Sequence, residues 1–298
     1  MTDNITFSER LETVGDKVTL ALDALIPRVI GPESELYSAM RYAALGGGKR
    51  LRPLFVLECG RLFDVPAKRL MRVAAAVECI HTYSLIHDDL PCMDNDDLRR
   101  GQPTVHKAYS ESLAVLAGDA LQTLAFEILA DEETHSQPRI RVALIENLAK
   151  ASGARGMVGG QAIDMSATGA KMEMALIARM QRMKTGSLIQ FSAEAGAIMA
   201  GASDEARQAL TGFAHDLGLA FQITDDLLDA EGDPKKTGKA VGKDAAQGKA
   251  SFVDDLGVEG ARQHTKLLGE QAKAHLDIFG SSATILHQSI DFIVNRSR

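Results

Sequence analysis

Residues 73–97 read VAAAVECIHTYSLIHDDLPCMDNDD, an apolar segment that runs directly into five aspartates within ten positions. The segment and its surroundings are rich in residues of high helix propensity, which predicts a helix over residues 67–89. Pro91 lacks the N–H that a continuing helix would donate, and it biases Leu90 away from helical backbone angles. We therefore expect the aspartates at the end of a helix, beside an apolar core.

The remainder of the chain has the same helical character. Aromatic residues make up 5% of the sequence, Trp is absent, and no segment sustains the apolar–polar alternation of a strand. The all-α fold class follows from this composition, and because nothing in the chain has the composition of a linker, a single domain remains open. Apolar residues at intervals of three and four predict helices over 8–26, 33–45, 53–62, 67–89, 110–131, 138–152, 173–200, 204–230 and 258–295.

Composition and charge argue against several classes of protein. The 298 residues include 33 Lys and Arg against 40 Asp and Glu, and the net charge of −7 argues against nucleic acid as a partner. The longest stretch without Asp, Glu, Lys or Arg, Ile278–Ile290, has 13 residues, so no membrane span is expected. The N-terminus has no apolar signal segment. Cys59, Cys79 and Cys92 lack metal-ligand spacing and are typical of reduced thiols, which predicts a cytoplasmic protein.

A second acidic segment, FQITDDLLD at residues 221–229, ends another apolar helix. Asp225 and Asp229 are four residues apart, about 40° around a helix, so both can hold one ion, and Asp226 lies on the next face. Either acidic segment alone is also explained as a solvated surface. Two such segments at the ends of apolar helices in one chain favour a functional pair.

Carboxylates without His or Cys partners favour Mg²⁺ over zinc, because Mg²⁺ keeps several waters and bridges one or two carboxylates to phosphate oxygens. In the first segment Asp88 and Asp94 are six residues apart, about 240° on an uninterrupted helix. Both reach one ion only if the chain unwinds after Asp89, and Pro91 provides that break.

A polyphosphate ligand would also need cations. Any one lysine or arginine alone is an ordinary solvated side chain. His81 lies about two helical turns before Asp88 on the same helix face, where its imidazole can donate to a phosphate. The candidate cations are Lys49, Arg50 and Arg52 in GGGKRLRP, Arg99 and Arg100, Lys184 in KTGS, and Lys239, Lys243 and Lys249 in the Gly- and Lys-rich stretch 232–249.

The segments GGGKRLRP, IHTYSLIHDDLPCMDNDDLRRG, KTGSLI and FQITDDLLD, followed by the lysines of GK and GKAS, resemble those of the short-chain trans-prenyltransferases, also called polyprenyl diphosphate synthases. The resemblance implies one domain over residues 1–298 with the isoprenoid synthase fold, a bundle of mostly antiparallel helices around a deep central cavity. It also implies that the two aspartate segments face each other at the cavity mouth, where three Mg²⁺ ions hold an allylic diphosphate.

The resemblance assigns roles to individual residues. The metal ligands would be Asp88, Asp89, Asp94, Asp225 and Asp229. The allylic substrate, dimethylallyl or geranyl diphosphate, would contact Arg99, Lys184 and Lys239, and Lys249 would reach over the closed site. Isopentenyl diphosphate would bind without metal to Lys49, Arg52, His81 and Arg100. Thr185 and Gln222 would line the reacting carbons.

The implied reaction agrees with the residues present. Mg²⁺ and cations would stabilise the departing diphosphate, the alkene of isopentenyl diphosphate would attack the allylic cation, and a proton would then be lost. Closure of the lysine-rich stretch would exclude water. The reaction needs no protein nucleophile, and the sequence shows no Ser-His-Asp or Cys-His arrangement.

Product length in this family depends on side chains about one turn before the first aspartate, which are Tyr83 and Ser84 here. Helix geometry puts Ser84 about 40° from Asp88 and Tyr83 about 140° away, so geometry alone does not place Tyr83 under the substrate. An aromatic residue here, with Pro91-Cys92 inserted in the motif, resembles bacterial farnesyl diphosphate synthases and implies a C15 product. Plant-type C20 geranylgeranyl diphosphate synthases share nearly the same motif and are the alternative.

Other classes fit less well. A class I terpene cyclase would lack the second aspartate segment and the isopentenyl site, a phosphohydrolase would need a general base, and a non-catalytic regulatory subunit typically loses one aspartate segment. Homodimers are usual in the family, and the small residues of SLIQFSAEAGAIMAGAS would allow close helix packing, as would an ordinary core helix. Asp254 and Asp255 receive no role.

Overall fold

A computed structural model describes residues 6–166, 173–231 and 252–296. The chain divides into two compact units. Unit 1 comprises Met1–Leu57 and Asp64–Ile145, and unit 2 comprises Glu58–Phe63 and Glu146–Arg298. The expectation of a single domain over residues 1–298 stays a prediction.

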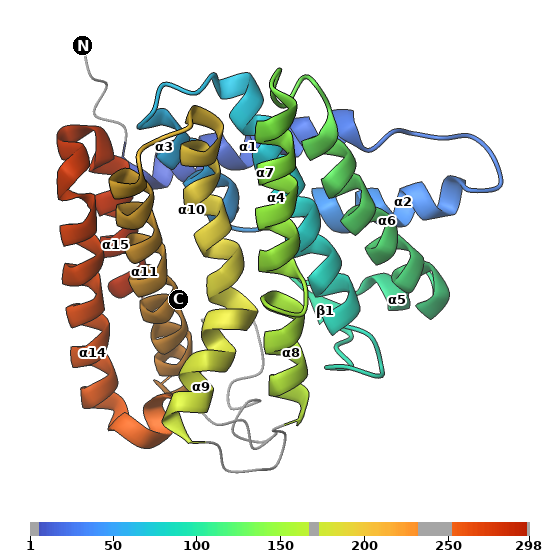
Figure 1. The fold of residues 1–298 in the computed structure, drawn as a ribbon. Coiled ribbons are helices and arrows are strands. Elements are labelled where there is room, and N and C mark those ends of the chain that lie inside the picture. The colour runs from blue at the N-terminus through green and yellow to red at the C-terminus, as the bar shows by residue number, and fades with distance from the viewer. Residues whose placement is uncertain (1–5, 167–172, 232–251, 297–298) are drawn as a thin grey trace. The chain divides into compact units, whose positions relative to one another are not determined.

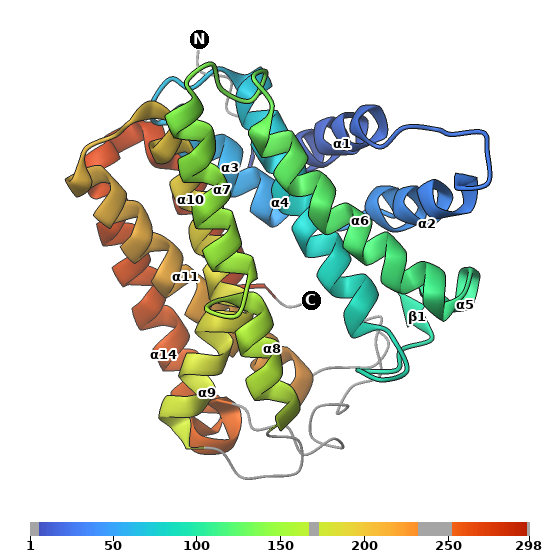
Figure 2. The same ribbon diagram turned by 45° about the vertical axis from the view of Figure 1, so that its right-hand side comes forward.

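Unit 1 is built around one long apolar helix. It contains α1 (Phe7–Leu25), α2 (Ser34–Leu45), the start of α3 (Leu51–Arg61), α4 (Ala67–Asp88), α5 (Val105–Ala108), α6 (Glu111–Ala130) and the start of α7 (Pro138–Ser152). Helix α4 is buried without interruption from Val73 to Ile80, and α6 lies beside it in both views of Figures 1 and 2. A helix that is apolar on nearly all sides belongs in a core, so α4 carries its C-terminal aspartates on a rigid support.

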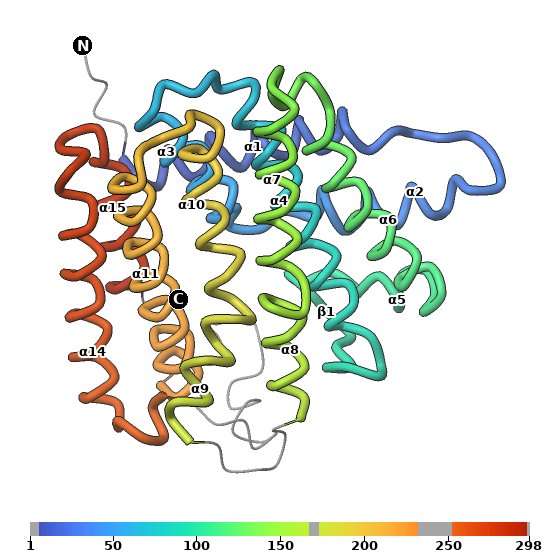
Figure 3. The backbone as a smooth tube through the Cα atoms, viewed as in Figure 1, coloured from blue at the N-terminus to red at the C-terminus, as the bar shows by residue number. Residues whose placement is uncertain are grey.

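Unit 2 is also helical. It contains the end of α7, α8 (Met157–Ser166), α9 (Met174–Gln181), the π-helical segment η1 (Arg182–Gly186), α10 (Ser187–Ala200) and α11 (Asp204–Glu231). The chain continues with α14 (Phe252–Leu276), the 3₁₀ segment η2 (Asp277–Ala283) and α15 (Thr284–Val294). Figure 3 shows α11 and α14 running alongside each other. Near the end of α11 their packing buries an apolar cluster that includes Ile223, Leu227 and Phe252, so the second aspartate segment also lies on a packed helix.

The structure confirms the all-α class, and most predicted helices have the expected bounds within a few residues. Five features differ. Residues 98–103 form a short antiparallel hairpin, β1 (Leu98–Arg99) and β2 (Gln102–Pro103), followed by the unpredicted α5. The unpredicted α8 occupies a glycine-rich stretch. The range 173–200 contains η1, and the range 258–295 is interrupted by η2, where Gly280 has a φ of 53°.

Helix α6 has the length and composition of a membrane span, with a mean hydropathy of 1.5 over 18 residues. The core helix of a water-soluble protein passes the same test, so α6 is weak evidence for a span. Its buried residues, Ala114, Ala117, Gly118 and Leu121 among them, are those of a helix packed on a neighbour, which here is α4.

Candidate functional site

The first aspartate segment unwinds as the sequence predicted. Helix α4 ends at Asp88, and the chain folds back so that the Asp94 N–H donates to the Asp88 carbonyl at 2.8 Å. The N–H groups of Met93 and Asn95 both donate to the Leu90 carbonyl, at 2.9 and 3.1 Å. Asp88 and Asp94 are thus joined through their backbones, although a continuous helix would keep them apart.

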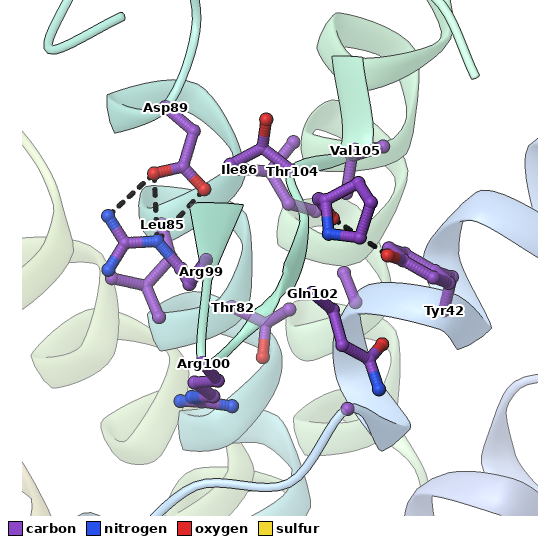
Figure 4. Close-up of a pocket in the computed structure, with 13 residues that line it drawn as sticks. Tyr42, Thr82, Leu85, Ile86, Asp89, Arg99, Arg100, Gln102, Thr104 and Val105 are labelled. Atoms are coloured by element: carbon purple, nitrogen blue, oxygen red, sulfur yellow. Dashed lines mark hydrogen bonds and ion pairs between the residues drawn. The ribbon is translucent and has the colours of Figure 1, made fainter. Parts of the chain in front are cut away.

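Asp89 has a different environment. Its carboxylate is 3% exposed and accepts three hydrogen bonds from Arg99, at 2.6, 2.8 and 2.9 Å (Figure 4). Burial raises the pKa of the Asp89 carboxyl, and the Arg99 guanidinium opposes that rise. This pair argues against Asp89 as a metal ligand and occupies the Arg99 side chain that the resemblance assigned to the allylic diphosphate.

The hairpin that carries Arg99 encloses a small pocket with α2 and α4 (Figure 4). Its volume is about 50 Å³, and Thr82, Asp89, Arg99, Arg100 and Gln102 are among the lining residues. The Tyr42 hydroxyl closes one side by donating to the Pro103 carbonyl at 2.7 Å. The hairpin is therefore tied to both helices, which fixes the two arginines beside the first aspartate segment.

Basic side chains in unit 1 gather around His81. Burial lowers the pKa of His81 well below its usual value, and Arg52 and Arg100 lower it further. Burial also lowers the pKa of Arg52 and of Arg100, while the carboxylate of Glu78 opposes both changes. The structure thus brings together three of the four residues predicted to bind isopentenyl diphosphate, in a cluster of like charge that favours an anion. Lys49, the fourth, precedes Arg50 in the same loop.

Glycines make the close approach of Arg100 possible. Its guanidinium donates to the Gly47 carbonyl and lies over Gly48, where a Cβ would be 2.5 Å from the Arg100 Cζ. Gly47 and Gly48 have φ angles of 81° and 124°, values that glycine adopts readily because it has no Cβ. The glycines that follow the end of α2 therefore also make room for a site residue.

Tyr83 is buried beneath the first aspartate segment. It is 5% exposed, its ring meets the His87 ring edge-on at 5.7 Å, and its hydroxyl has no partner among the described residues. Burial raises the pKa of Tyr83 to about 12, and the nearby Asp88 adds to the rise. Ser84 is half-buried, and its hydroxyl donates to the His81 carbonyl at 2.9 Å. Tyr83 is thus the larger buried side chain of the two length candidates.

The second aspartate segment lies in unit 2, and its approach to the first stays a prediction. Asp225 is 47% exposed and forms an ion pair with Arg296, whose guanidinium lies 4.3 Å from the centre of the Phe221 ring. Burial lowers the pKa of Arg296 to about 10. The Asp226 carboxylate accepts from the Phe252 N–H at 2.8 Å, which links α11 to the start of α14. Sequence reasoning missed Arg296, although it belongs to a visibly basic C-terminus.

Lys184 and Thr185 lie in η1, and π-helical segments occur frequently at functional sites. The Lys184 ammonium donates to Asp164 of α8 at 2.6 Å. Gly160, one turn earlier on α8, allows this approach, because a Cβ there would lie 2.2 Å from the Lys184 backbone nitrogen. Sequence reasoning missed Asp164, whose only signal is that it is the single charge in MVGGQAIDMS.

The remaining predicted residues are placed as follows. Gln222 and Asp229 are half-buried on α11. The predictions for Lys239, Lys243 and Lys249 fall outside the described residues.

The carboxylates of the first aspartate segment suit a magnesium ion whose coordination shell is completed by substrate oxygens. Within residues 6–166, 173–231 and 252–296, no group of three or more His, Cys, Asp or Glu side chains is arranged to hold a metal. Mg²⁺ commonly binds one or two carboxylates, several waters and the oxygens of a bound phosphate. Asp88 and Asp94, brought together by their backbone hydrogen bond, supply two carboxylates of this kind.

Aspartates at the ends of core helices, with a basic cluster in the same unit as the first of them, define an all-helical protein equipped to bind diphosphate groups. The sequence model of the polyprenyl synthetase family matches residues 33–278. A farnesyl diphosphate synthase from Geobacillus stearothermophilus is 46% identical over 87% of this chain and 87% of that protein. Geranylgeranyl pyrophosphate synthase 4 from Arabidopsis thaliana is 40% identical over 98% of this chain and 78% of that protein.

The chain is also similar to a synthase of known structure. An FPP/GFPP synthase from Zymomonas mobilis in its apo form matches with a TM-score of 0.90 and 49% sequence identity, covering 96% of this chain and 98% of that one. The chain belongs to the polyprenyl synthetase family, and it is a trans-prenyltransferase of isoprenoid biosynthesis.

Proposed function

We propose that the protein is a Mg²⁺-dependent farnesyl diphosphate synthase. It condenses isopentenyl diphosphate with dimethylallyl diphosphate and then with geranyl diphosphate, releasing diphosphate at each step and ending at a C15 product. The buried Tyr83 beneath the first aspartate segment is the observation that carries the C15 length. The relative from Geobacillus, a farnesyl diphosphate synthase, supports the same product, and the relative from Zymomonas is an FPP/GFPP synthase.

The residues of unit 1 hold the nucleophilic substrate. Arg52, Arg100 and His81, with Lys49 beside them, bind the diphosphate of isopentenyl diphosphate. His81 is neutral in the empty cluster because burial and its arginine neighbours lower its pKa, so one of its ring nitrogens carries a proton that it donates to a phosphate oxygen. These contacts orient the alkene toward the allylic carbon.

The aspartates and Lys184 act on the allylic diphosphate. Asp88, Asp94 and Asp225, with Asp229 beside them, would hold Mg²⁺, which would supply positive charge that stabilises the departing diphosphate. Lys184, oriented by its 2.6 Å hydrogen bond to Asp164, adds a fixed cation at the same group. Thr185 and Gln222 line the reacting carbons. Water must be excluded, since it would quench the allylic cation.

The proton that leaves the new chain needs an acceptor. The departing diphosphate, held by the cations that bound it, is the nearest base that the reaction itself produces. No catalytic side chain is required for this step.

The first test is product analysis. Purified protein is incubated with Mg²⁺, isopentenyl diphosphate and dimethylallyl diphosphate, and the dephosphorylated alcohols are identified by gas chromatography with mass detection. Farnesol is expected. Geranylgeraniol would keep the reaction but replace C15 by C20, the length made by the Arabidopsis relative according to its name.

Mutation of the first segment tests the metal site. Asp88→Ala should lower turnover by several orders of magnitude with the fold intact. Asp97→Ala is the matched control, because this carboxylate from the same segment is 75% exposed and pairs with Lys107 at 2.8 Å. Equal turnover in the two variants would remove Asp88 from the site.

We further propose a homodimer in the cytoplasm. Val115 and Leu116 on α6 are apolar side chains that are 41% and 51% exposed, and a second copy would cover them. Light scattering after size exclusion should give twice the 32.0 kDa of one chain, and a monomer would contradict the dimer. All three cysteines are free thiols, as expected in a reducing compartment.

A further inference from the structure

A buried ion pair lies directly beneath the basic cluster of unit 1. The Arg50 guanidinium donates through Nη1 to the Glu78 carboxylate, and the two side chains are 1% and 2% exposed. The Arg50 side chain is thus buried in an ion pair, unlike the residues of the loop GGGKRLRP that are proposed to bind substrate. We propose that Arg50 and Glu78 are positioning residues that set the affinity of the adjacent cluster for the diphosphate of isopentenyl diphosphate. This inference rests on the proposed function.

The first argument is the geometry of the loop. Arg50 Nη2 donates to the Ala44 carbonyl at 2.7 Å, so the same guanidinium bonds the last turn of α2 and the middle of α4. These two hydrogen bonds tie the glycine-rich loop between α2 and α3 to both α2 and α4. Lys49 and Arg52 lie on either side of Arg50 in the sequence, and their positions therefore depend on where Arg50 is anchored.

The second argument is the backbone at Arg50. Its φ is 49°, in the left-handed region that residues with a Cβ seldom adopt. A non-glycine residue stays there when surrounding contacts hold it, and the bonds to Glu78 and Ala44 supply such contacts. The Arg50 carbonyl also accepts from the Leu54 N–H at 3.1 Å as α3 begins. The buried pair therefore fixes the direction in which the loop enters the helix that carries Arg52.

The third argument is charge. Glu78 is an acid buried close to Arg50, Arg52 and Arg100, and its carboxylate favours the charged forms of the last two against the effect of burial. Removing its charge would leave the mutual repulsion of the three guanidiniums uncompensated in the empty cluster. Breaking a buried pair from one side leaves an uncompensated charge, and a mobile basic cluster binds a diphosphate less tightly than a preorganised one.

Arg50 and Glu78 are too deeply buried to contact the substrate themselves. Their effect must therefore appear in the affinity for isopentenyl diphosphate and for inorganic diphosphate, while binding of the allylic substrate to Lys184 and the aspartates is affected much less. If the pair only stabilised the fold, its loss would lower the melting temperature and leave both affinities unchanged.

The test uses two conservative variants and one control. Arg50→Lys keeps the charge and loses the two-sided guanidinium fork, and Glu78→Gln keeps the shape and loses the charge. The control is Arg72→Met on the same helix α4. Arg72 is 14% exposed, and its partners are Asp131, at 2.8 Å, and the Thr134 hydroxyl, at 2.9 Å, neither of which belongs to the basic cluster. Circular dichroism and melting temperature establish that each variant is folded.

Two measurements decide the outcome. We expect the KM for isopentenyl diphosphate to rise at least tenfold in either folded site variant, with the KM for geranyl diphosphate within about twofold of wild type. By calorimetry, inorganic diphosphate should bind at least tenfold more weakly to the same variants. Arg72→Met should lower the melting temperature and change neither affinity. Unchanged isopentenyl KM and unchanged diphosphate binding in a folded Glu78→Gln or Arg50→Lys protein would overturn the inference.

Calorimetry also separates this inference from the proposed function. If wild-type protein binds diphosphate and Glu78→Gln weakens that binding, yet no isopentenyl diphosphate is consumed, then the positioning role holds and the proposed function fails. If wild-type protein makes farnesyl diphosphate and the variants retain both affinities, then the proposed function holds and the positioning role fails.

Discussion

Substitution of Gly160 by alanine should damage the active site through backbone contact alone. A Cβ at this position of α8 would lie 2.2 Å from the backbone nitrogen and 2.6 Å from the Cα of Lys184. Ordinary van der Waals contact begins at 3.4 Å. Helix α8 and η1 would have to separate by about 1.2 Å, the difference between 3.4 and 2.2 Å, and neither side of this contact is a flexible side chain that could move away.

The displacement has two consequences of known size. Overpacking of this kind costs about 1–3 kcal/mol, from which the higher helix propensity of alanine removes about 1 kcal/mol. In a protein of this length each 1 kcal/mol lowers the melting temperature by about 2–4 °C. The Lys184–Asp164 hydrogen bond, 2.6 Å long, would exceed bonding distance if η1 moved away from α8 by 1.2 Å. A misplacement of about 1 Å in a substrate-positioning group costs on the order of 100-fold in rate.

The assay combines thermal denaturation with turnover of isopentenyl and geranyl diphosphates. Gly160→Ala should lower the melting temperature by a few degrees and turnover much more severely. Gly15→Ala is the control, since Gly15 also lies within a helix and a Cβ there would meet only the Arg50 Cγ at 3.8 Å; its stability should be unchanged or higher. Wild-type turnover in Gly160→Ala would refute the argument that close packing of α8 on η1 positions Lys184.

Three further substitutions have expected outcomes. Tyr83→Ala removes a buried ring and should lengthen the product beyond C15, whereas Ser84→Ala should not; an unchanged farnesol yield by gas chromatography would contradict the length role of Tyr83. His81 has a pKa held well below its usual value by burial and neighbouring arginines, so only the unfolded chain takes up this proton as the pH falls below about 6.5. The free energy of unfolding should therefore decline below that pH by up to about 1.4 kcal/mol per pH unit. Urea denaturation at pH 7 and 5.5 should show a smaller decline for His81→Asn than for wild type. An equal decline in the two proteins would count against a neutral buried His81. Arg296→Gln removes the cation paired with Asp225 and should lower the Mg²⁺ concentration for half-maximal turnover, and a higher requirement would show that Arg296 assists the site.

The sequence was informative where the local chemistry is self-contained. Pro91 determines where α4 unwinds because proline acts on the preceding residues alone, and the Asp94–Asp88 backbone hydrogen bond confirms that break. The helix bounds of α1, α2, α4, α6, α7 and α11 follow in the same way from propensity and apolar periodicity.

Helix α8 was not predicted because glycine can play either of two structural roles. In isolation, Gly159 and Gly160 lower helix propensity and favour a loop. In the folded protein these residues permit contacts that any Cβ would prevent, as Gly160 does against Lys184. A single sequence cannot separate a glycine that breaks a helix from one that lets two helices touch, since the second role depends on a partner 24 residues away.

Pairing between charged residues was the least predictable part of the site. Asp89 stands beside Asp88 in the motif, yet Arg99 binds one carboxylate with three hydrogen bonds while the other remains half-exposed. The unpredicted hairpin decides this difference, because the two residues of β1 turn Arg99 back toward the end of α4. A motif therefore identifies how many carboxylates are present, whereas the turn that follows it decides which of them the arginine binds.

Glu78 carries the same reasoning one step further. It is the one charge between Val73 and Ile80, a run that the structure buries completely, and a buried carboxylate is tolerated only when a cation compensates it. The other residues from Val73 to Ile80 are uncharged, so the cation has to come from another part of the chain. In unit 1 the GGGKRLRP loop is rich in cations. Of its three cations, the one held in a left-handed backbone is the one that turns inward to meet Glu78. An isolated acid in an apolar helix is thus a signal, readable from sequence, that one cation of a neighbouring basic loop is anchored inward, which fixes the positions of the other cations in that loop.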